Sequence, residues 1–466
     1  MRISIQPYQY VFIGLMALQS CIISAKDQRT PQAVPQSFKT ANLQGNQVTD
    51  TAQLVKWWDL YQDPVLQQLI RTALDSNRNL LIAATRVEQA RLAAANAQVA
   101  LYPQFGYNTQ AGAASVGRDA QRTGTALDGG VFRALGAINW EIDIWGRLKQ
   151  LSTAAAQDLL ASEANRKALQ VSLIAEVATN YFLLRDLDNR LAIAQSTLAG
   201  RKESTRIIAE RFSKGYVAEL DKLQAEQQEA LAAATIPAFQ RAIIQTENAL
   251  GLLLGNFNDT VVRGRANAEQ TLVPSIPSGL SSTLLLRRPD IQRAEAAFQA
   301  QLARVGVAKT SLYPSLSLTG LLGFASPQLS SLLGSNGFVA SGLAGLTGPI
   351  FQFGQNKRRI AIQEQALKEA GFAYEQTVIT AFRDVNIALT AYRTFDEEYQ
   401  IRFKQAAAAR KALVLSKARY DFGYTSYLEV LIQETNLFEA ELQASQALQQ
   451  KLSSVAGLYR ALGGGW

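Results

Sequence analysis

Side chains that could do catalytic or metal chemistry are few in this chain and lie far apart. Its 466 residues include no histidine and one cysteine, Cys21. The chain therefore cannot form a histidine-based catalytic triad, a zinc finger or an intramolecular disulfide. Carboxylates are plentiful, but the spacing of Asp143, Glu176, Asp290 and Asp384 indicates no acid–base pair. The sequence predicts no enzyme, no metal site and no bound cofactor.

The charge of the chain does not indicate a nucleic-acid partner either. Lys and Arg number 46 against 38 Asp and Glu, which gives a formal net charge of +8. These basic residues are spread along the chain without dense runs, so a nucleic-acid interface is not predicted. Ala, Leu and Gln dominate, and this composition favours long helices over mixed α/β structure.

The single cysteine ends a predicted export signal. Arg2 begins it, and residues 11–18 form an apolar run shorter than the roughly 20 residues that span a bilayer. The run ends in Leu18-Gln19-Ser20-Cys21, which resembles a bacterial lipoprotein box. We predict a signal peptide over residues 1–20 and covalent lipid on Cys21. The residue after the cysteine is Ile22 and not the Asp that would retain the protein at the inner membrane. The alternative is an unmodified cysteine in an ordinary signal peptide.

The remaining chain contains two copies of one unit, about 208 residues apart. Five landmarks recur in the same order: Leu101-Tyr102-Pro103 and Leu312-Tyr313-Pro314, Ile144-Trp145-Gly146 and Gln352-Phe353-Gly354, Glu176-Val177 and Asp384-Val385, Arg211 to Tyr216 and Arg419 to Tyr424, Leu254-Gly255 and Leu462-Gly463. The predicted organisation is an N-terminal extension over residues 21–62, a first repeat over 63–275 and a second over 276–466.

Each repeat has the same predicted elements. An opening helix runs from Asp63 to about Val99, or from Ser282 to about Thr310, and ends where a Leu-Tyr-Pro step forbids helix continuation. Two strands follow in each repeat, predicted at 104–116, 131–144, 315–324 and 338–350. Long helices then occupy 147–255 and 356–462, each reversed at a Gly-Tyr turn. Their heptad-like apolar spacing is typical of coiled coils and describes architecture, not chemistry.

Four strands per chain do not suffice for a membrane barrel. Single-chain barrels start at about eight strands, and lipid does not tolerate open sheet edges. The strands therefore form either a soluble sheet or a barrel pooled from several chains. The export signal and the aromatic strand ends (Trp140, Trp145, Phe351 and Phe353) favour the pooled barrel, which requires a homo-oligomer.

Several motifs carry a resemblance to a known family. They are Trp57-Trp58-Asp59, Asp63-Pro64, Trp140 to Arg147, Ser278 to Ser282, Arg287 to Ile291, Tyr313 to Gly320 and Leu458 to Trp466. Over nearly the whole mature length the chain resembles TolC-type outer-membrane factors, in their OprM-, CusC- and CmeC-like lipoprotein branch. The resemblance implies a mainly α protein with a membrane β-barrel part. Each tandem-repeat protomer would give four strands and long coiled-coil helices, and a trimer would form a 12-stranded barrel and an α-helical periplasmic tunnel.

The same resemblance implies a function and partners. The trimer would be a lipid-anchored exit duct in the outer membrane, and it would passively conduct drugs or other toxic small molecules. Its partners would be a periplasmic adaptor and an inner-membrane pump of the resistance-nodulation-division type. Two alternatives remain open, the channel of an ABC-driven type I protein secretion system and a periplasmic coiled-coil scaffold without a pore.

The resemblance places the functional residues at the two Gly-Tyr turns, the expected periplasmic tip. The implied gate residues are Arg419, Tyr420, Asp421, Tyr424 and Thr425, and the implied adaptor-docking residues are Arg211, Lys214, Gly215, Tyr216 and Gly423. The family commonly has an Asp where this chain has Thr425. Asp421 is therefore the candidate for a ring of negative charges around the channel, with one carboxylate from each chain. Alternatively, Asp421 is a solvated residue at the end of a helix. Arg419 and Tyr420 could instead brace neighbouring helices through hydrogen bonds.

Overall fold

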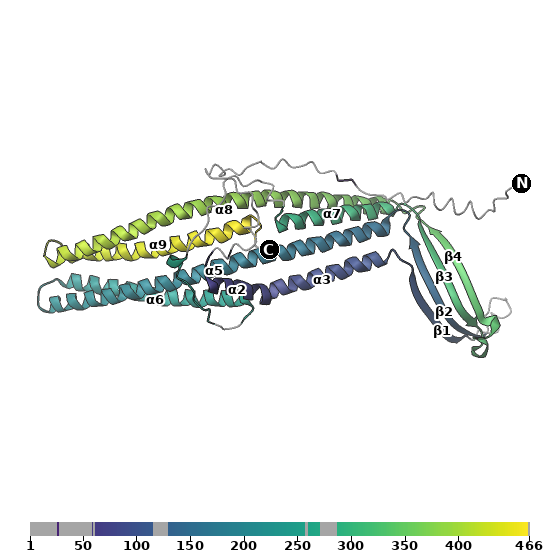
Figure 1. The fold of residues 1–466 in the computed structure, drawn as a ribbon, viewed down its shortest axis with the longest axis horizontal. Coiled ribbons are helices and arrows are strands. Elements are labelled where there is room, and N and C mark those ends of the chain that lie inside the picture. Colours follow the sequence, from purple (N-terminus) through teal and green to yellow (C-terminus); the bar gives the residue numbers. More distant parts are fainter. Residues whose placement is uncertain are drawn as a thin grey trace. The chain divides into compact units, whose positions relative to one another are not determined.

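The computed structural model of the protein describes residues 26–27, 58, 61–114, 129–256, 260–270 and 287–464 (Figure 1). These residues divide into two compact units. The first contains Met1–Pro31, Arg86–Glu163 and Arg293–Glu375, and the second contains Gln32–Thr85, Ala164–Gln292 and Gln376–Trp466. The predicted signal peptide and Cys21 lie outside the described residues, as do most of the extension 21–62 and the first residues of the second repeat.

The first unit contains a four-stranded antiparallel sheet. Its strands are β1 (Gln104–Ala114), β2 (Gly129–Ile142), β3 (Ser315–Ser326) and β4 (Phe338–Thr347), hydrogen-bonded in that order (Figure 1). Two one-turn 3-10 helices, Leu329–Ser331 and Ser335–Gly337, connect β3 to β4. The two strands of one repeat therefore pair with each other, and β2 joins the repeats by pairing with β3, as in the register Trp140↔Leu318.

Three of the predicted strand ends are wrong. The second strand ends at Ile142, not at residue 144, because the Asp143 carboxylate accepts the amides of Leu148 and Lys149 (3.0 and 2.8 Å) and so starts the following helix. The fourth ends at Thr347, not at residue 350. The third extends two residues beyond its prediction, to Ser326.

The helices repeat in length as well as in order. Helices α3 (Arg78–Val99) and α7 (Pro289–Thr310) lead to the sheet, and both have 22 residues. Helices α5 (Arg147–Ser213) and α8 (Gln355–Asp421) leave it, and both have 67 residues. Each turns back into a shorter helix, α6 (Glu219–Leu254) or α9 (Tyr427–Ala461). The prediction of a mainly helical tandem repeat with four strands is confirmed.

The opening helix of the first repeat is two helices, which corrects the prediction of one from Asp63 to Val99. Helix α2 (Pro64–Ser76) ends at Asn77, whose ψ of 121° is extended, before α3 begins. The Asn77 side chain accepts the Leu80 amide (3.1 Å) and donates to the Leu253 carbonyl (2.8 Å). The break thus lets one side chain start α3 and bind the end of α6.

The core of the second unit confirms the predicted helical stripe. Ile174, Val177, Tyr181 and Leu184 of α5 are at most 1% exposed. Buried Asp63 caps α2 and accepts a hydrogen bond from the Tyr181 hydroxyl (2.6 Å). Within the described residues, no helix combines the length and the hydropathy that a bilayer crossing requires.

Candidate functional site

The turn between α5 and α6 is closed by backbone hydrogen bonds around a glycine. Gly215 has φ of +82°, a conformation that glycine adopts without steric cost. The Gly215 amide donates to the Phe212 carbonyl and the Tyr216 amide donates to the Arg211 carbonyl, both at 2.9 Å. This pair of bonds is the Schellman motif, which satisfies the last carbonyls of a helix.

The turn between α8 and α9 has the same backbone. Gly423 has φ of +79°, its amide donates to the Tyr420 carbonyl (2.9 Å), and the Tyr424 amide donates to the Arg419 carbonyl (2.8 Å). The Gly-Tyr pair predicted to reverse each helix therefore does so through one common geometry. Any functional difference between the turns must come from the side chains.

An acidic side chain gathers two of the predicted gate residues at the second turn. Glu429, in the first turn of α9, accepts hydrogen bonds from the Thr425 hydroxyl and from Arg419 Nη1 (3.5 Å). The contacts join the end of α8, the turn and the beginning of α9. Arg419 thereby braces neighbouring helices, which is the second of the two roles considered for it from the sequence.

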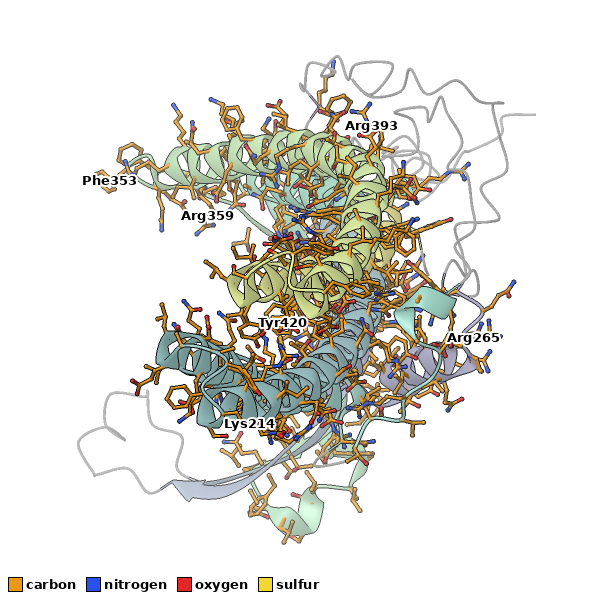
Figure 2. All side chains as sticks on the ribbon, turned by 90° about the vertical axis from the view of Figure 1, so that its left-hand side faces the viewer. Lys214, Arg265, Phe353, Arg359, Arg393 and Tyr420 are labelled. Atoms are coloured by element: carbon orange, nitrogen blue, oxygen red, sulfur yellow. The ribbon has the colours of Figure 1, made fainter. Side chains whose placement is uncertain are left out.

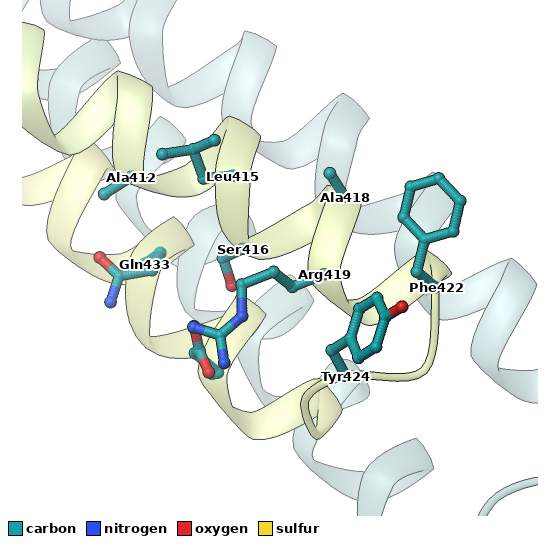
Figure 3. A pocket seen from close by; sticks show the side chains of 9 residues that line it. Ala412, Leu415, Ser416, Ala418, Arg419, Phe422, Tyr424 and Gln433 are labelled. Atoms are coloured by element: carbon teal, nitrogen blue, oxygen red, sulfur yellow. The ribbon is translucent and has the colours of Figure 1, made fainter.

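A groove of about 450 Å³ lies beside these contacts (Figure 3). Its walls are apolar side chains of α8, with Arg419, Glu429 and Gln433 at one side. Phe422 and Tyr424 also line the groove and are 78% and 76% exposed, and their ring centroids lie 6.5 Å apart. An exposed aromatic pair beside charged groups is typical of a protein-docking surface.

Tyr420 lies between the two hairpins. Its ring is 5.5 Å from the ring of Tyr427 on α9, and the Arg211 guanidinium of α5 lies over it at 5.1 Å. Figure 2 shows Tyr420 on the α8–α9 hairpin, facing the α5–α6 hairpin. A cation over an aromatic face is worth about 0.5 to 1 kcal/mol at an exposed site, so this contact is weak enough to break.

Buried charges lie behind Tyr420. Glu434 is 8% exposed, its carboxylate pairs with Lys417 Nζ at 2.8 Å, and Arg201 of α5 donates to the Gln228 carbonyl at 2.7 Å. Burial and the nearby Glu434 carboxylate raise the pKa of Tyr427 to about 12, and burial lowers the pKa of Arg201. Tyr427 is therefore neutral at physiological pH, and the charge of Glu434 is balanced by cations.

Ion pairs and charged hydrogen bonds continue along the α8–α9 seam. Lys451 pairs with Asp396 (2.5 Å), Arg402 donates to Gln443 (2.8 Å), Arg410 pairs with Glu441 (2.6 Å), Lys417 pairs with Glu434 and Arg419 pairs with Glu429. We call these five contacts the α8–α9 ladder. Each joins one helix of the hairpin to the other.

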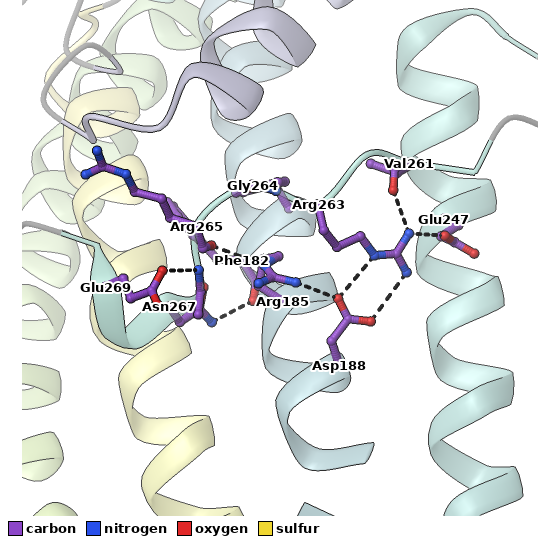
Figure 4. A network of polar contacts seen from close by, with 12 residues as sticks. Phe182, Arg185, Asp188, Glu247, Val261, Arg263, Gly264, Arg265, Asn267 and Glu269 are labelled. Atoms are coloured by element: carbon purple, nitrogen blue, oxygen red, sulfur yellow. Dashed lines mark hydrogen bonds and ion pairs between the residues drawn. The ribbon is translucent and has the colours of Figure 1, made fainter. Parts of the chain in front are cut away.

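The α5–α6 seam lacks such a ladder. Near its turn the ion pairs of Glu210 with Lys214 and Arg206 stay within α5, and among the described residues no ion pair joins α5 directly to α6. Farther along, Arg263 of the segment after α6 binds Asp188 of α5 and Glu247 of α6 (Figure 4). Two further polar contacts join the helices: Arg201 of α5 donates to the Gln228 carbonyl of α6, and Lys222 of α6 lies over the Phe212 ring of α5 at 5.6 Å.

The structure separates the predicted gate residues into two groups. Arg419, Tyr420 and Thr425 make the contacts that hold the second turn, whereas Asp421 and Tyr424 are exposed. Asp421 forms no ion pair with any described residue. Of the predicted docking residues, Lys214 and Tyr216 are exposed at the first turn, and Arg211 contacts Tyr420 instead.

Glu429 is a site residue that the sequence analysis missed. A signal was present, because Ser426 and Glu429 have the Ser-x-x-Glu spacing of a helix capping box. The box is not formed, since the Ser426 side chain makes no cap hydrogen bond. The carboxylate binds Thr425 and Arg419 instead. No group of three metal-ligating side chains is found in the described parts of the chain.

Comparison with known proteins identifies this pair of hairpins and its sheet. A family model described as outer membrane efflux protein matches residues 69–256 and 280–464. The chain is 32% identical over 457 residues to the solvent efflux pump outer membrane protein SrpC of Pseudomonas putida, with 97% of each chain covered. It is 30% identical over 455 residues to the cation efflux system protein CusC of Escherichia coli O157:H7, with 98% of each covered.

A solved structure agrees with the family match. The CmeC outer membrane channel of Campylobacter jejuni superposes with a TM-score of 0.89 at 27% identity, covering 96% of this chain and 95% of that one. The chain therefore belongs to the outer membrane efflux protein family, as its motifs predicted. It is an efflux protein of the outer membrane, and its family is not one of enzymes. This assignment decides against the pore-less scaffold.

Proposed function

We propose that the protein is the passive exit duct of a tripartite efflux system and works as a homotrimer. The sheet supports this oligomer, because among the described residues no strand pairs with the outer edge of β1 or of β4, and four strands cannot close in lipid. Three chains of four strands each give a closed barrel of twelve. The helices then form a tunnel on the periplasmic side.

Exposed apolar side chains along the helices also support the homotrimer. On α8, Ile379, Ile387, Ile401 and Leu415 are 51 to 66% exposed and follow one another at about one or two heptads. On α6, Leu231, Ile244 and Leu252 are 51 to 77% exposed. Stripes of this length on a single chain are typical of surfaces covered by another helix.

The proposed gate rests on one observation, the convergence of Arg419 and Thr425 on Glu429. In a trimer these contacts recur three times around the channel. They are polar and partly exposed, so each contributes at most about 1 kcal/mol and can be exchanged for contacts with a partner. We propose that the duct opens when the α8–α9 hairpin is displaced at this end and Arg211 releases Tyr420.

Conductance of the purified protein in a planar bilayer tests the gate. Glu429→Gln removes the charge that Arg419 binds, so the mean conductance should rise severalfold. Asp221→Asn is the matched control, because Asp221 occupies the corresponding place in the first turn of α6 and forms no ion pair with the described residues. An equal rise in both variants, or no rise in Glu429→Gln, contradicts the proposed gate.

We propose a periplasmic adaptor and a resistance-nodulation-division pump as partners. The exposed rings of Phe422 and Tyr424 beside a charged groove support docking at this turn. A photo-crosslinker at position 424 in living cells, followed by mass spectrometry, identifies what binds there. An adaptor of an ABC exporter would instead assign the duct to type I protein secretion, and capture of no adaptor would remove the docking site from this turn.

The cargo we propose is a class of toxic small molecules, including drugs. SrpC is named for solvent efflux and CusC for cation efflux, so similar ducts serve unlike cargoes. Methionine ladders for soft metal ions are absent, because both methionines, Met1 and Met16, fall in the predicted signal. We therefore propose that the pump, not the duct, selects the cargo.

We also propose that Cys21 carries the lipid that anchors the mature chain. The Leu18 to Cys21 box supports this assignment. Mass spectrometry of the N-terminal peptide should find an acylated Cys21 as the first residue, and Cys21→Ser should abolish the modification. An unmodified Cys21, or an N-terminus at another residue, contradicts it.

A further inference from the structure

Two equivalent junctions connect a strand to a long helix, and the first is satisfied within the chain. Between β2 and α5, Trp145 stacks on Tyr313 (ring centroids 4.8 Å apart) and its indole N–H donates to the Pro314 carbonyl (2.8 Å). The Arg147 guanidinium pairs with Glu141 at 2.6 Å. Trp145 and Arg147 of this junction thus both have interaction partners within the first unit.

The second junction, between β4 and α8, leaves its aromatic side chains exposed. Ile350, Phe351 and Phe353 are 102%, 74% and 80% exposed, and the two phenylalanine rings pack against each other with centroids 4.6 Å apart. Phe353 has φ of +50°, which is unfavourable for a bulky residue. Its ring points outward in Figure 2. None of these three apolar side chains is buried by the described residues, so the junction leaves an apolar surface open to a partner outside the chain.

Three cations follow these aromatic residues. Lys357, Arg358 and Arg359 lie in the first turns of α8, all exposed, where the helix dipole disfavours positive charge. Arg358 donates to the Phe353 carbonyl (3.0 Å) and so supports the turn. Lys357 and Arg359 form no ion pair with a described residue. The next acidic residue along α8, Glu364, is engaged by Lys309 at 3.4 Å.

We propose that residues 350–359, the junction patch, bind anionic phospholipid headgroups of the membrane leaflet nearest the helices. Aromatic rings favour the membrane interface, and Lys and Arg next to a membrane segment bind anionic headgroups. The patch has these groups in that order along the chain, apolar at the strand end and cationic in the helix. This inference rests on the proposed barrel, which puts the sheet in the bilayer.

A second copy of the chain fits the patch less well than lipid does. In the proposed barrel β4 would pair with β1 of a neighbouring copy, and Leu101 to Pro103, just before β1, include no acid. The β2–α5 junction of that copy has two acids, Glu141 and Asp143. Glu141 is already paired with Arg147, and Asp143 accepts the Leu148 and Lys149 amides. Both carboxylates are thus engaged within their own chain, and Glu141 is neutralised there by Arg147. Charge complementarity therefore favours a phosphate-bearing headgroup.

Native mass spectrometry of the full-length oligomer in neutral detergent tests the proposal. The probes are phosphatidylglycerol and phosphatidylcholine at equal concentration, and the readout is the ratio in which they are retained. Lys357→Gln/Arg359→Gln should lower the preference for phosphatidylglycerol about thirtyfold, since each of the two basic residues contributes about 1 kcal/mol at a charged membrane. Lys404→Gln/Lys411→Gln removes two exposed lysines from the later part of α8 and should leave the preference unchanged.

The other outcomes either overturn the lipid proposal or distinguish its failure from a failure of the proposed barrel. An unchanged preference in Lys357→Gln/Arg359→Gln overturns it, and so does an equal loss in the control variant. Dissociation of the oligomer without loss of lipid preference assigns the patch to a second copy instead. Conductance of the same samples reports the barrel. Wild-type protein that binds phosphatidylglycerol but does not conduct would contradict the proposed duct and not the lipid contact.

Discussion

The two helical hairpins share a backbone but differ in what holds them closed. Both turn at a glycine near φ of +80° with the same pair of hydrogen bonds. The α8–α9 hairpin is then held by the α8–α9 ladder, whereas the ion pairs near the α5–α6 turn stay within one helix. In the ladder each ion pair has at least one partly exposed partner, and such pairs can open and exchange partners at small cost. The difference indicates which hairpin is the movable one.

The opposite ends of the hairpins show the same contrast. The last carbonyls of α6 accept neutral donors, with the Ser76 hydroxyl on Leu254 (2.5 Å) and the Asn77 amide on Leu253 (2.8 Å). The last turn of α9 accepts a charged donor, because Arg288 Nη1 binds the Ala461 carbonyl at 2.5 Å. The last carbonyls of α6 are therefore fastened by neutral donors, and the last turn of α9 by a charged one.

The largest effect is expected at Arg288. Its side chain is 8% exposed, donates to Ala461 and Ala381, and pairs with Asp290 at 2.8 Å. Arg288→Ala should lower the free energy of unfolding by about 3 kcal/mol, because it leaves carbonyls and a carboxylate unpaired. Asn77→Ala, at the other hairpin, should lower it by only about 1 kcal/mol. Chemical unfolding followed by circular dichroism measures both, and equal losses would remove the contrast.

A smaller effect is expected from reversing a charge beside each turn. Lys417→Glu places a second carboxylate against buried Glu434 and should cost about 2 kcal/mol. Lys214→Glu meets Glu210 on the surface of α5 and should cost less than about 0.5 kcal/mol. Bilayer conductance should rise in the first variant and stay unchanged in the second. Equal conductance in both would mean that the ladder does not keep the turn closed.

The smallest effect is a dependence on pH. Burial alone would raise the pKa of Asp290, but the Arg288 guanidinium outweighs it and holds this pKa below the ordinary 3.8. A lowered pKa contributes stability that is present above pH 3.8 and is lost as the pH falls through the folded-state value. Asp290→Asn should therefore cost about 1 kcal/mol at pH 7, and the difference from wild type should shrink in acid.

A neutral variant of the first hairpin is the control for this pH dependence. Ser76→Ala removes a hydroxyl that does not titrate, so its cost should be the same at pH 7 and in acid. Urea unfolding at pH 7, 5 and 3 compares the two variants. A constant cost for Asp290→Asn would show that Arg288 does not act on the charged carboxylate.

The amino-acid sequence predicts elements whose causes are local. The turns follow from Gly215 and Gly423, the ends of α3 and α7 from Leu-Tyr-Pro, and the buried stripe from heptad spacing. The errors have distant or competing causes. Asn77 divides the opening helix because its amide binds a carbonyl 176 residues away, and Asp143 ends β2 because its carboxylate prefers the amides of α5.

The candidate functional site also has features that the sequence predicts and features that only the structure shows. The sequence places Arg419, Tyr420 and Thr425 at a turn, because the positions of glycines and repeats can be counted. It does not show that Glu429 binds two of them, that Arg211 covers Tyr420 or that Asp421 is left exposed. Those pairings depend on the register and rotation of helices packed side by side. Helix hydrogen bonds are local, so the sequence alone determined the helices and turns, and only tertiary packing decided which charges meet across the seams.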